Sequence, residues 1–583
     1  NTNKMAETLI SPGVLAREND QSFIQRQPEA FGAALIGPSQ LGPVGIPTKV
    51  TSFSQWQNIF GSGIAVSGAQ EVEYVSATSI RNYFSQGGES LLFTRVVSGS
   101  FGSAFTTPTS ASNCLIAQSG NLALESFRLK TISEGDILNN FQAADSADGT
   151  LTNGTANNVR WEVTTVDYET GKFSLLVRRG NDNTNNKVIL ETWSDLSLDV
   201  TSPRYIAKVI GDSFNSIVTD SSTGETYVKS NGNYVNNSNY VYVSLVPGAI
   251  NGYFDNAGAV KSSLTSSMPI PSSGSFVGGS GGLGLSTAHF GNLISQDNVN
   301  GLRAVDFTSS ISLLNNKEYT FNVITAPGLN YHNDTTEVAS LVTLAENKQD
   351  CIAIIDLVAY NAQLGTVTTQ AGSINSSYAA TYWPWLQVID GSGNPVWTPP
   401  SALIPGVYAF TDKSSEPWFA PAGMIRGALG NVIKAERRLT TGNRDTLYTA
   451  NVNPIATFPG NDVVVFGQKT LQKQASALDR VNVRRLLISL KSFISQIADN
   501  LVFEQNTAAT RNNFLTQVNP YLETVQQRQG LFAFKVVMDE TNNGPDVVDR
   551  NELVGQIFLQ PTKTAEFIML DFNILPTGAT FPA

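Results

Sequence analysis

The sequence predicts a multidomain α+β protein, and three observations carry that prediction. The chain has 583 residues, of which 41% are hydrophobic, so it exceeds the size that a single core usually serves. Charged residues make up only 15%, a balance typical of β-rich and loop-rich structure with a weakly charged surface. Helical and strand periodicities occupy separate stretches. We expect an α/β middle portion, a C-terminal α+β domain with two long helices over a sheet, inserted β-rich outer domains, and extended arms at both ends.

The predicted N-terminal arm covers residues 1–21. Its apolar segment TLISPGVLA is interrupted by Pro12 and Gly13, which favour an extended chain over a helix. Residues 22–98 form a compact block with a strand in AFGAALIGPS, helices in SFSQWQNIFG and SATSIRNYFSQGG, and a buried strand in SLLFTRVV.

Residues 99–300 are predicted to be one or two inserted β-rich domains. Ser, Asn, Gly and Thr dominate this stretch, and short strands alternate with turns. VRWEVTTVDYETGKFSLLVRRG indicates a hairpin with Glu169, Thr170 and Gly171 in its turn, and a helix is expected from Arg204 onward.

Strand, helix and strand alternate in residues 301–450, which we join to residues 22–98 as one middle domain. YTFNVITAPG predicts a strand and turn, and DTTEVASLVTLAENKQ predicts a helix capped by Asp334 or Thr335. CIAIIDLVA is apolar on both faces, which favours a parallel sheet covered on both sides. Cys351 in this run is expected to be a buried free thiol.

Residues 451–572 are predicted to form the C-terminal domain, and residues 573–583 the C-terminal arm. DVVVFG indicates a buried strand, and apolar positions at helical spacing predict long helices around residues 483–501 and 514–525. LFAFKVVMD and ELVGQIFLQP are predicted strands. They precede PTKTAEFIMLDFNI, a markedly apolar strand for the end of a sequence.

No motif in the sequence supports catalysis or cofactor binding. The net charge of −11 and pI near 4.9 argue against a broad nucleic-acid-binding face. GSGGLG at residues 279–284 matches a dinucleotide-binding pattern, but it follows a Pro- and Ser-rich loop instead of a strand. His289 and His332 are far from each other and from the two cysteines. We therefore expect no enzyme activity, cofactor, metal, direct nucleic-acid contact or membrane insertion.

A secreted β-rich adhesin or glycan-binding protein is the main alternative. In YWPWLQV, the residues Tyr382, Trp383 and Trp385 would suit a sugar platform, although aromatic residues beside a proline more often pack at a domain junction. Such a protein would need an export signal, and NTNKMAETLISPG has no apolar signal core. A hydrolase that uses buried carboxylates has no specific motif in its favour.

Several segments together resemble the tail sheath proteins of contractile phage tails. TLISPGVLARENDQS resembles their start, YFSQGGESLLFTRVV and LETWSDLSLDVTSPRYIAKVI resemble internal segments, and EPWFAPAGMIRGAL resembles a turn. NVNPIATFPGNDVVVFGQKTL, DRVNVRRLLISLKSFISQIADNLVFEQN and GQIFLQPTKTAEFIMLDF resemble the C-terminal region in the family's order, with FEQN in place of FEPN. Residues 100–190 carry few marks of the family.

The resemblance implies a structural subunit of a virion tail, assembled in the host cytoplasm. Such subunits stack as hexameric rings in a sleeve around an inner tube, in a metastable extended state. Contraction then drives the tube through the host envelope. The implied partners are further copies of the chain, the tail tube protein, and baseplate and tail terminator proteins.

The resemblance also implies that terminal arms exchange strands between subunits and that the C-terminal domain faces the tube. Short apolar segments at both ends independently suit strand addition to another chain's sheet. Alternatively, residues 557–559 and 567–572 form an acceptor hairpin that stays in its own subunit, and only residues 573–581 cross to a neighbouring subunit. The candidate strand-exchange residues are Leu9, Ile10, Val14, Leu15, Ile557, Leu559, Ile568, Leu570, Phe572 and Ile574.

A local basic patch is predicted on the first long C-terminal helix. Its cations are Arg480, Arg484, Arg485 and Lys491. Charge on an amphipathic helix is usually solvated, and contact with an acidic partner such as the tube is the alternative.

Overall fold

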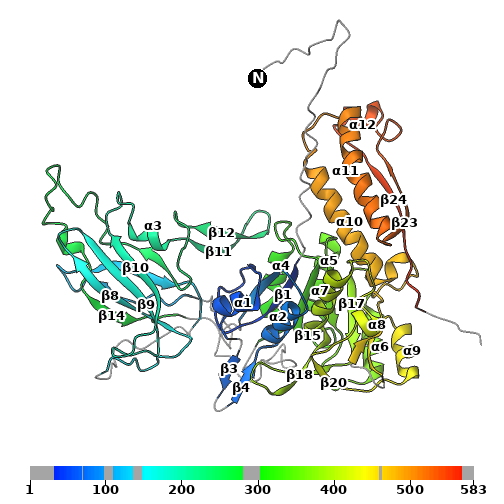
Figure 1. The fold of residues 1–583 in the computed structure, drawn as a ribbon, viewed down its shortest axis with the longest axis horizontal. Helices are drawn as coiled ribbons and strands as arrows, with labels where there is room; N and C mark the ends of the chain where they lie inside the picture. The colour runs from blue at the N-terminus through cyan, green and yellow to red at the C-terminus, as the bar shows by residue number, and fades with distance from the viewer. Residues whose placement is uncertain are drawn as a thin grey trace, which may run out of the picture. The chain divides into compact units, whose positions relative to one another are not determined.

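The computed structural model describes residues 32–62, 64–67, 70–97, 109–135, 148–279, 302–458 and 463–566 (Figure 1). Both predicted arms lie outside these ranges. The same holds for His289, for most of GSGGLG and for eight strand-exchange candidates, namely Leu9, Ile10, Val14, Leu15, Ile568, Leu570, Phe572 and Ile574. All of the described ranges belong to the second of two units of the chain, which begins at residue 31, and the following description concerns this second unit.

An eight-stranded sheet forms the centre of the second unit, and its inner strands are parallel. The edge strands β2 and β22 run antiparallel to their neighbours. Segments far apart in the sequence meet here, because β1 lies between β5 and β15. In sheet order the strands are β2 Thr48–Val50, β5 Leu91–Val96, β1 Ala33–Pro38, β15 Val323–Asn330, β16 Ile352–Asp356, β17 Ala379–Trp383, β21 Asn453–Thr457 and β22 Val463–Val465.

Helices cover both faces of this sheet, so successive strand residues enter opposite cores. In β16, Ala353 and Ile355 pack into one core, whereas Ile352 and Ile354 pack into the other. Cys351 is a buried free thiol, as predicted. One face carries α4 Thr308–Leu314, α5 Thr335–Lys348, α6 Leu364–Ser373 and α9 Thr441–Thr449, and the other carries α1 Phe53–Phe60, α2 Val75–Ser85 and α7 Ile404–Ser414.

Local signals explain several element ends. The hydroxyl of Ser52 caps α1 by accepting from the Gln55 backbone N–H. Asp334 occupies the cap position of α5, as predicted, although its carboxylate accepts from the Asn330 backbone instead. Gly87, with φ of +100°, follows α2 and adopts a backbone conformation that glycine permits.

The β-rich insertion between β5 and β15 has its own hydrophobic core, in which Trp161, Phe127 and Phe173 are buried. It contains the predicted hairpin of β8 and β9 and the predicted helix α3. Arg95 at the end of β5 links it to the sheet by donating to the Glu134 carbonyl at 2.9 Å. Its elements are β6 Ile116–Ala117, β7 Glu125–Thr131, β8 Val159–Asp167, β9 Lys172–Arg179, β10 Ile189–Ser197, α3 Ile206–Ile210, β11 Phe214–Thr219, β12 Thr226–Asn231, β13 Val241–Leu245 and β14 Ser272–Ser275.

Several smaller elements lie outside the central sheet. They comprise the hairpin β3 Ile64–Ser67 and β4 Gln70–Glu73, the sheet of β18 Leu386–Ile389, β19 Pro395–Thr398 and β20 Val432–Ala435, and the short helix α8 Gly423–Arg426. Short 3₁₀ helices span Thr265–Ser267, Ala304–Phe307, Pro400–Ala402 and Ala477–Asp479.

The C-terminal domain packs two long helices over a hairpin, as predicted. Its separate core includes Leu486, Leu490, Phe514, Val518 and Leu522. The elements are α10 Val481–Asp499, α11 Ala508–Gln527, β23 Leu531–Val537, α12 Pro545–Asp549 and β24 Gln556–Pro561.

These layers confirm the predicted multidomain α+β class, with two local differences. The turn predicted at APG is part of β15, which continues to Asn330 with every residue buried. The sheet also extends past the predicted boundary at residue 451, because β21 and β22 pair with it. The domain boundaries themselves stay predictions.

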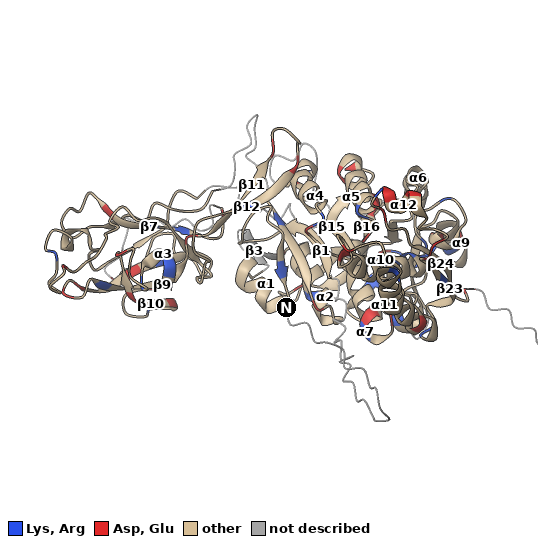
Figure 2. Cartoon of the chain, turned by 90° about the horizontal axis from the view of Figure 1, so that it is seen from above, with Lys and Arg blue, Asp and Glu red and all other residues tan. Residues whose placement is uncertain are grey.

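Charge is sparse, as the composition predicts. Figure 2 shows basic and acidic residues interspersed along a ribbon that is mostly uncharged. Within the described ranges, no helix combines the length and the apolar character needed to cross a membrane.

Asp356 is a buried carboxyl at the end of β16. It accepts hydrogen bonds from the backbone N–H of Ser401, at 3.2 Å, and from the Ser401 hydroxyl. Burial raises its pKa to about 7, although these hydrogen bonds oppose the shift. The folded state therefore holds this proton more tightly than the unfolded state does.

We predict that Asp356→Asn removes part of the pH dependence of stability. The contribution of Asp356 is fully present below the unfolded pKa and is lost as pH rises through about 7. Between pH 5 and pH 8 the wild-type protein should lose on the order of 2 kcal/mol through this group. Urea unfolding across this range measures the loss, which the variant should lack. Asp220→Asn, in an exposed turn, is the control, and a variant that keeps the wild-type pH profile would refute the assignment.

Candidate assembly interface

Two buried arginines join the start of α10 to the sheet domain. Arg485 Nη2 donates to both carboxylate oxygens of Asp412, at 2.5 and 2.6 Å, and its guanidinium lies 4.5 Å from the Tyr408 ring centroid. Arg484 Nε donates to the Ser377 carbonyl at 3.2 Å. Both arginine side chains are buried, and each donates to an acceptor of the sheet domain, although Arg485 Nη1 has no hydrogen-bond partner among the described residues.

The predicted basic patch is therefore only partly exposed. Arg484 and Arg485 point into the chain and present no charge to a partner in this structure. Lys491 lies at the surface and donates to Gln349 Oε1 at 3.0 Å, while Arg480 pairs with Glu566 at 2.7 Å. A tube contact stays a prediction for Arg480 and Lys491.

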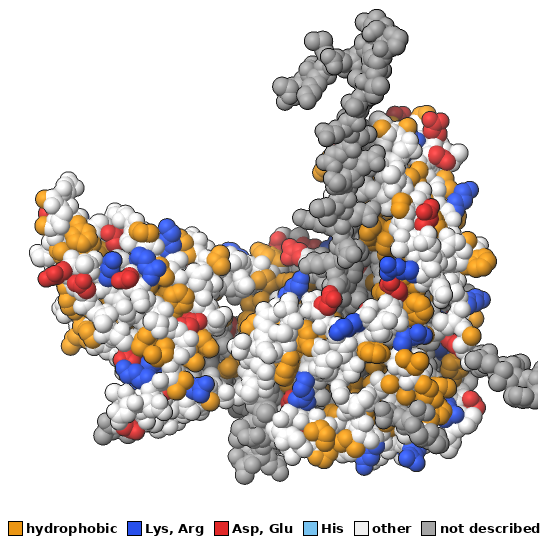
Figure 3. Space-filling model, in the orientation of Figure 1, with side chains coloured by type: hydrophobic (Ala, Val, Ile, Leu, Met, Phe, Trp, Pro, Cys, Tyr) orange, Lys and Arg blue, Asp and Glu red, His pale blue; other side chains and the backbone are white. Residues whose placement is uncertain are grey.

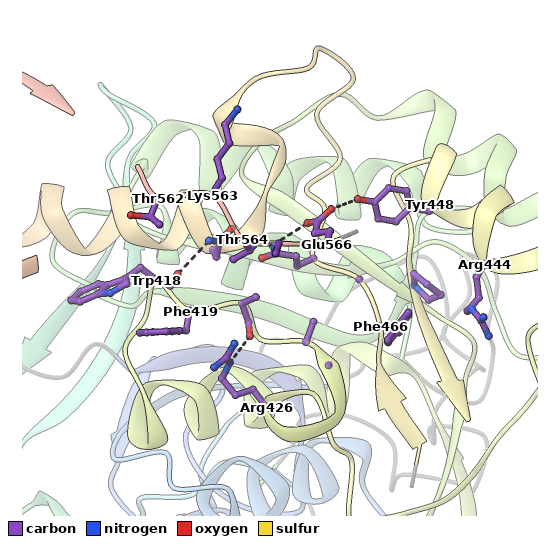
Figure 4. Close-up of a pocket in the computed structure, with 18 of the residues that line it drawn as sticks. Trp418, Phe419, Arg426, Arg444, Tyr448, Phe466, Thr562, Lys563, Thr564 and Glu566 are labelled. Carbon is purple, nitrogen blue, oxygen red and sulfur yellow. Dashed lines mark hydrogen bonds between the residues drawn. The ribbon is translucent and has the colours of Figure 1, made fainter. Parts of the chain in front are cut away.

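Glu566 anchors the segment that follows β24 onto the sheet domain (Figure 4). Its carboxylate accepts from Arg480 Nε at 2.7 Å, from Arg480 Nη2 at 2.9 Å, from Gln468 Nε2 at 3.1 Å and from the Tyr448 hydroxyl. Burial opposes its ionisation, but the hydrogen bonds from Tyr448 and Arg480 hold the Glu566 pKa below its usual range. The chain is thus fixed up to the last described residue.

The hairpin of β23 and β24 has one covered face and one exposed face. Ile557 and Leu559, both strand-exchange candidates, pack against the helical core together with Phe534. Phe532 and Phe558 are exposed, at 76% and 56%. Among the described residues these strands pair only with each other, so each keeps an outer edge that a further strand could join. A role for Ile557 and Leu559 in exchange stays a prediction.

A groove of about 610 Å³ lies beside the Glu566 anchor. Trp418, Phe419 and Phe466 form aromatic walls, and Arg426 and Arg444 stand among them (Figure 4). Figure 3 shows apolar side chains gathering on the visible face over α8 and α9, two helices that contribute to this groove. The lining therefore combines apolar contact area with two basic side chains.

The sugar-platform interpretation is wrong. Tyr382, Trp383 and Trp385 are at most 3% exposed. The first two lie in β17, an inner strand of the sheet, and the Trp385 indole N–H donates to the buried Val358 carbonyl at 3.1 Å. The Tyr382 hydroxyl lies 2.7 Å from that of Tyr408, inside the core.

Other sequence candidates form no cluster. His332 Nδ1 lies 3.0 Å from Gln370 Nε2, in a surface contact. In the part of the chain that the structure describes, no group of three His, Cys, Asp or Glu residues could hold a metal ion.

Sequence reasoning missed both the groove and the Glu566 anchor. Their residues come from positions between 418 and 566 and share no local periodicity. The only available signal was Glu566 itself, an acidic residue at the start of an apolar run.

Two family models match adjacent segments that cover this interface. Residues 297–471 match the phage tail sheath protein central domain, and residues 473–575 match the phage tail sheath C-terminal domain. The matched segments supply most of the sheet, the groove and the C-terminal domain. Residues 297–575 thus match the central and C-terminal domains of phage tail sheath proteins, in order along the chain.

Individual relatives agree with this assignment. The chain is 38% identical over 248 residues to the tail sheath protein of Vibrio phage KVP40, a match that covers 41% of this chain and 36% of the relative. It is 35% identical over 267 residues to that of Enterobacteria phage T4, covering 41% and 39%. The matches thus span well under half of these relatives' lengths. The crystal structure of a sheath tail protein from Listeria innocua shares the fold, with a TM-score of 0.53, 11% identity, and coverage of 92% of this chain and 96% of that chain.

We predict that Arg485→Ala destabilises the protein by about 3 kcal/mol, because it leaves Asp412 without its buried partner. Thermal or urea unfolding measures the change. Arg550→Ala is the matched control, since its ion pair with Glu552 is exposed on both sides and should change stability little. Equal effects from the two variants would contradict the role given to Arg485.

Glu566→Ala should release the segment that this residue anchors. Trypsin cleavage after the exposed Lys563 should become about tenfold faster, because the charged hydrogen bonds to Arg480 are lost. Glu552→Ala should leave the cleavage rate unchanged. If Glu566→Ala also leaves it unchanged, the anchor does not hold the segment.

Proposed function

We propose that this chain is the sheath subunit of a contractile phage tail. One observation carries the proposal: the central and C-terminal sheath domains follow each other over residues 297–575, and the β23–β24 hairpin of the second domain pairs with no third strand among the described residues. A subunit that must join others needs such edges, and an isolated soluble protein usually protects them.

The proposed assembly is a sleeve of stacked hexameric rings around an inner tail tube. Terminal segments containing Leu9, Ile10, Val14 and Leu15, or the apolar residues from 568 to 574, would add as strands beside a neighbour's β23–β24 hairpin. Main-chain hydrogen bonds would give this contact its strength, and alternate side chains its specificity. The C-terminal domain would face the tube, and the β-rich insertion would lie outside.

The proposed stroke needs no nucleotide and no catalysis. Exchanged strands keep their hydrogen bonds while each subunit rotates as a rigid body between two packings. The contracted packing is the lower in free energy, so the extended sleeve is metastable. The stroke would drive the tube through the host envelope.

The proposed partners are further copies of the chain, the tail tube protein, and baseplate and tail terminator proteins. The proposed location is the virion tail, after assembly in the host cytoplasm. The relatives that carry the name tail sheath protein support this proposal.

Truncation tests the proposed exchange. Deletion of residues 1–10 or of residues 567–583 should leave a folded, soluble protein that forms no sleeves under negative-stain microscopy. The second deletion keeps the Glu566 anchor, so a loss of assembly would not come from its absence. Val235→Lys, on an exposed site of the insertion, is a control that should still assemble.

Strand exchange and the sheath function are contradicted by different results. Truncated chains that still form sleeves would contradict strand exchange. A full-length chain that forms no sleeves would contradict the sheath function.

A further inference from the structure

The turn after α10 displays apolar side chains to solvent. Phe503 is fully exposed and Val502 is 59% exposed. Phe503 also has φ of 71°, a left-handed conformation that bulky residues rarely adopt. An exposed aromatic residue in a strained turn indicates a binding function, because neither feature stabilises the isolated chain.

Hydrogen bonds hold this turn in place. The Glu504 N–H donates to the Leu501 carbonyl at 3.0 Å, and Asn506 Nδ2 donates to the Glu552 carbonyl at 2.8 Å. Phe503 is therefore presented by a defined turn, with the exposed carboxylate of Glu504 beside it.

The groove beside Glu566 has the complementary chemistry. The guanidinium of Arg426 lies 5.1 Å from the Phe419 ring centroid, and that of Arg444 lies 5.2 Å from the Phe458 ring centroid. Neither arginine forms an ion pair with any described residue. The groove thus offers aromatic walls and two cations outside any ion pair among the described residues. Its lining also holds two carboxylates, Asp445 and Glu566, the second of which is bound by Arg480. The aromatic walls and the two cations suit an aromatic side chain followed by an acid.

The turn of one molecule cannot reach its own groove. Asn482, which lines the groove, lies in the first turn of α10, whereas Phe503 follows its last residue. The 19 residues of the helix span about 28 Å. A contact between these two sites must therefore join two copies of the chain.

We infer that residues 502–504 of one copy dock into the groove of a second copy. The inference rests on the proposed sheath function, which places many copies side by side, and it adds a side-chain contact to the proposed strand exchange. The turn and the groove are different surfaces, so the contact is head-to-tail. Head-to-tail contacts build rings and open helices, as a sleeve requires.

Cysteine cross-linking tests this contact directly. Both native cysteines are buried, so introduced surface thiols are the ones that react. Full-length Phe503→Cys and Thr441→Cys, the latter at the groove, are mixed under assembly conditions and treated with a short bismaleimide. The mixture should give a cross-linked dimer joined through these two positions, at least tenfold above either variant alone. Val235→Cys mixed with Thr441→Cys is the control and should give none.

A second measurement separates the contact from folding. Phe503→Ser should keep the wild-type melting temperature, because the side chain is fully exposed, and should lower the rate of self-assembly at least tenfold. Glu504→Arg should also impair assembly, and Arg444→Glu in the same chain should restore part of it.

Three other results would overturn the inferred docking of residues 502–504 into the groove. Sleeves without the cross-link would refute the contact and leave the sheath function standing. A cross-link that forms only after deletion of residues 567–583 would show that the chain's own C-terminal segment fills the groove. If neither sleeves nor cross-links form, both the contact and the sheath function fail.

Discussion

The position of α10 depends on two arginines buried against the sheet domain. Arg485 pairs with Asp412 of α7, and Arg484 with the carbonyl of Ser377. A buried guanidinium without its partner would be costly, so the start of α10 can move from the sheet domain only at a large energetic penalty. We call these two arginine contacts the α10 joint. The groove, the Glu566 anchor and the hairpin all contain or contact residues that follow this joint in the sequence. The interface therefore exists as one surface only while the joint is intact.

This joint gives the proposed stroke a mechanical basis. A subunit that flexed between its sheet domain and its C-terminal domain would absorb the energy that contraction should deliver to the tube. If the two arginine contacts stay intact, the subunit moves as a rigid body. The free-energy difference between the extended and contracted sleeves then comes from contacts between subunits and not from changes within each subunit. The sparse charge is consistent with contacts between subunits that are made mainly by strand edges and apolar side chains, because such contacts depend little on salt.

Periodicity in the sequence predicted most elements, since burial on one or both faces leaves a direct pattern. It identified α10, α11 and the doubly buried β16, and the order of family-like segments identified the sheath relationship.

Periodicity failed where tertiary contacts decide the outcome. Arg484 and Arg485 follow the pattern of solvated charge, but their partners come from residues 377 and 412, which no local pattern connects to α10. For Tyr382, Trp383 and Trp385 the proline in YWPWLQV favoured packing over a sugar platform, and their burial confirms that preference. The groove could not be predicted, since its walls come together only in the folded chain.

The most direct measurement is a pair of cryo-EM structures of the purified polymer, in its extended and contracted states. Our account predicts that the fold within each subunit is the same in both, with the Arg485–Asp412 pair intact and only the packing between subunits changed. A contracted state in which this pair is broken and the C-terminal domain has rotated against the sheet would contradict the account.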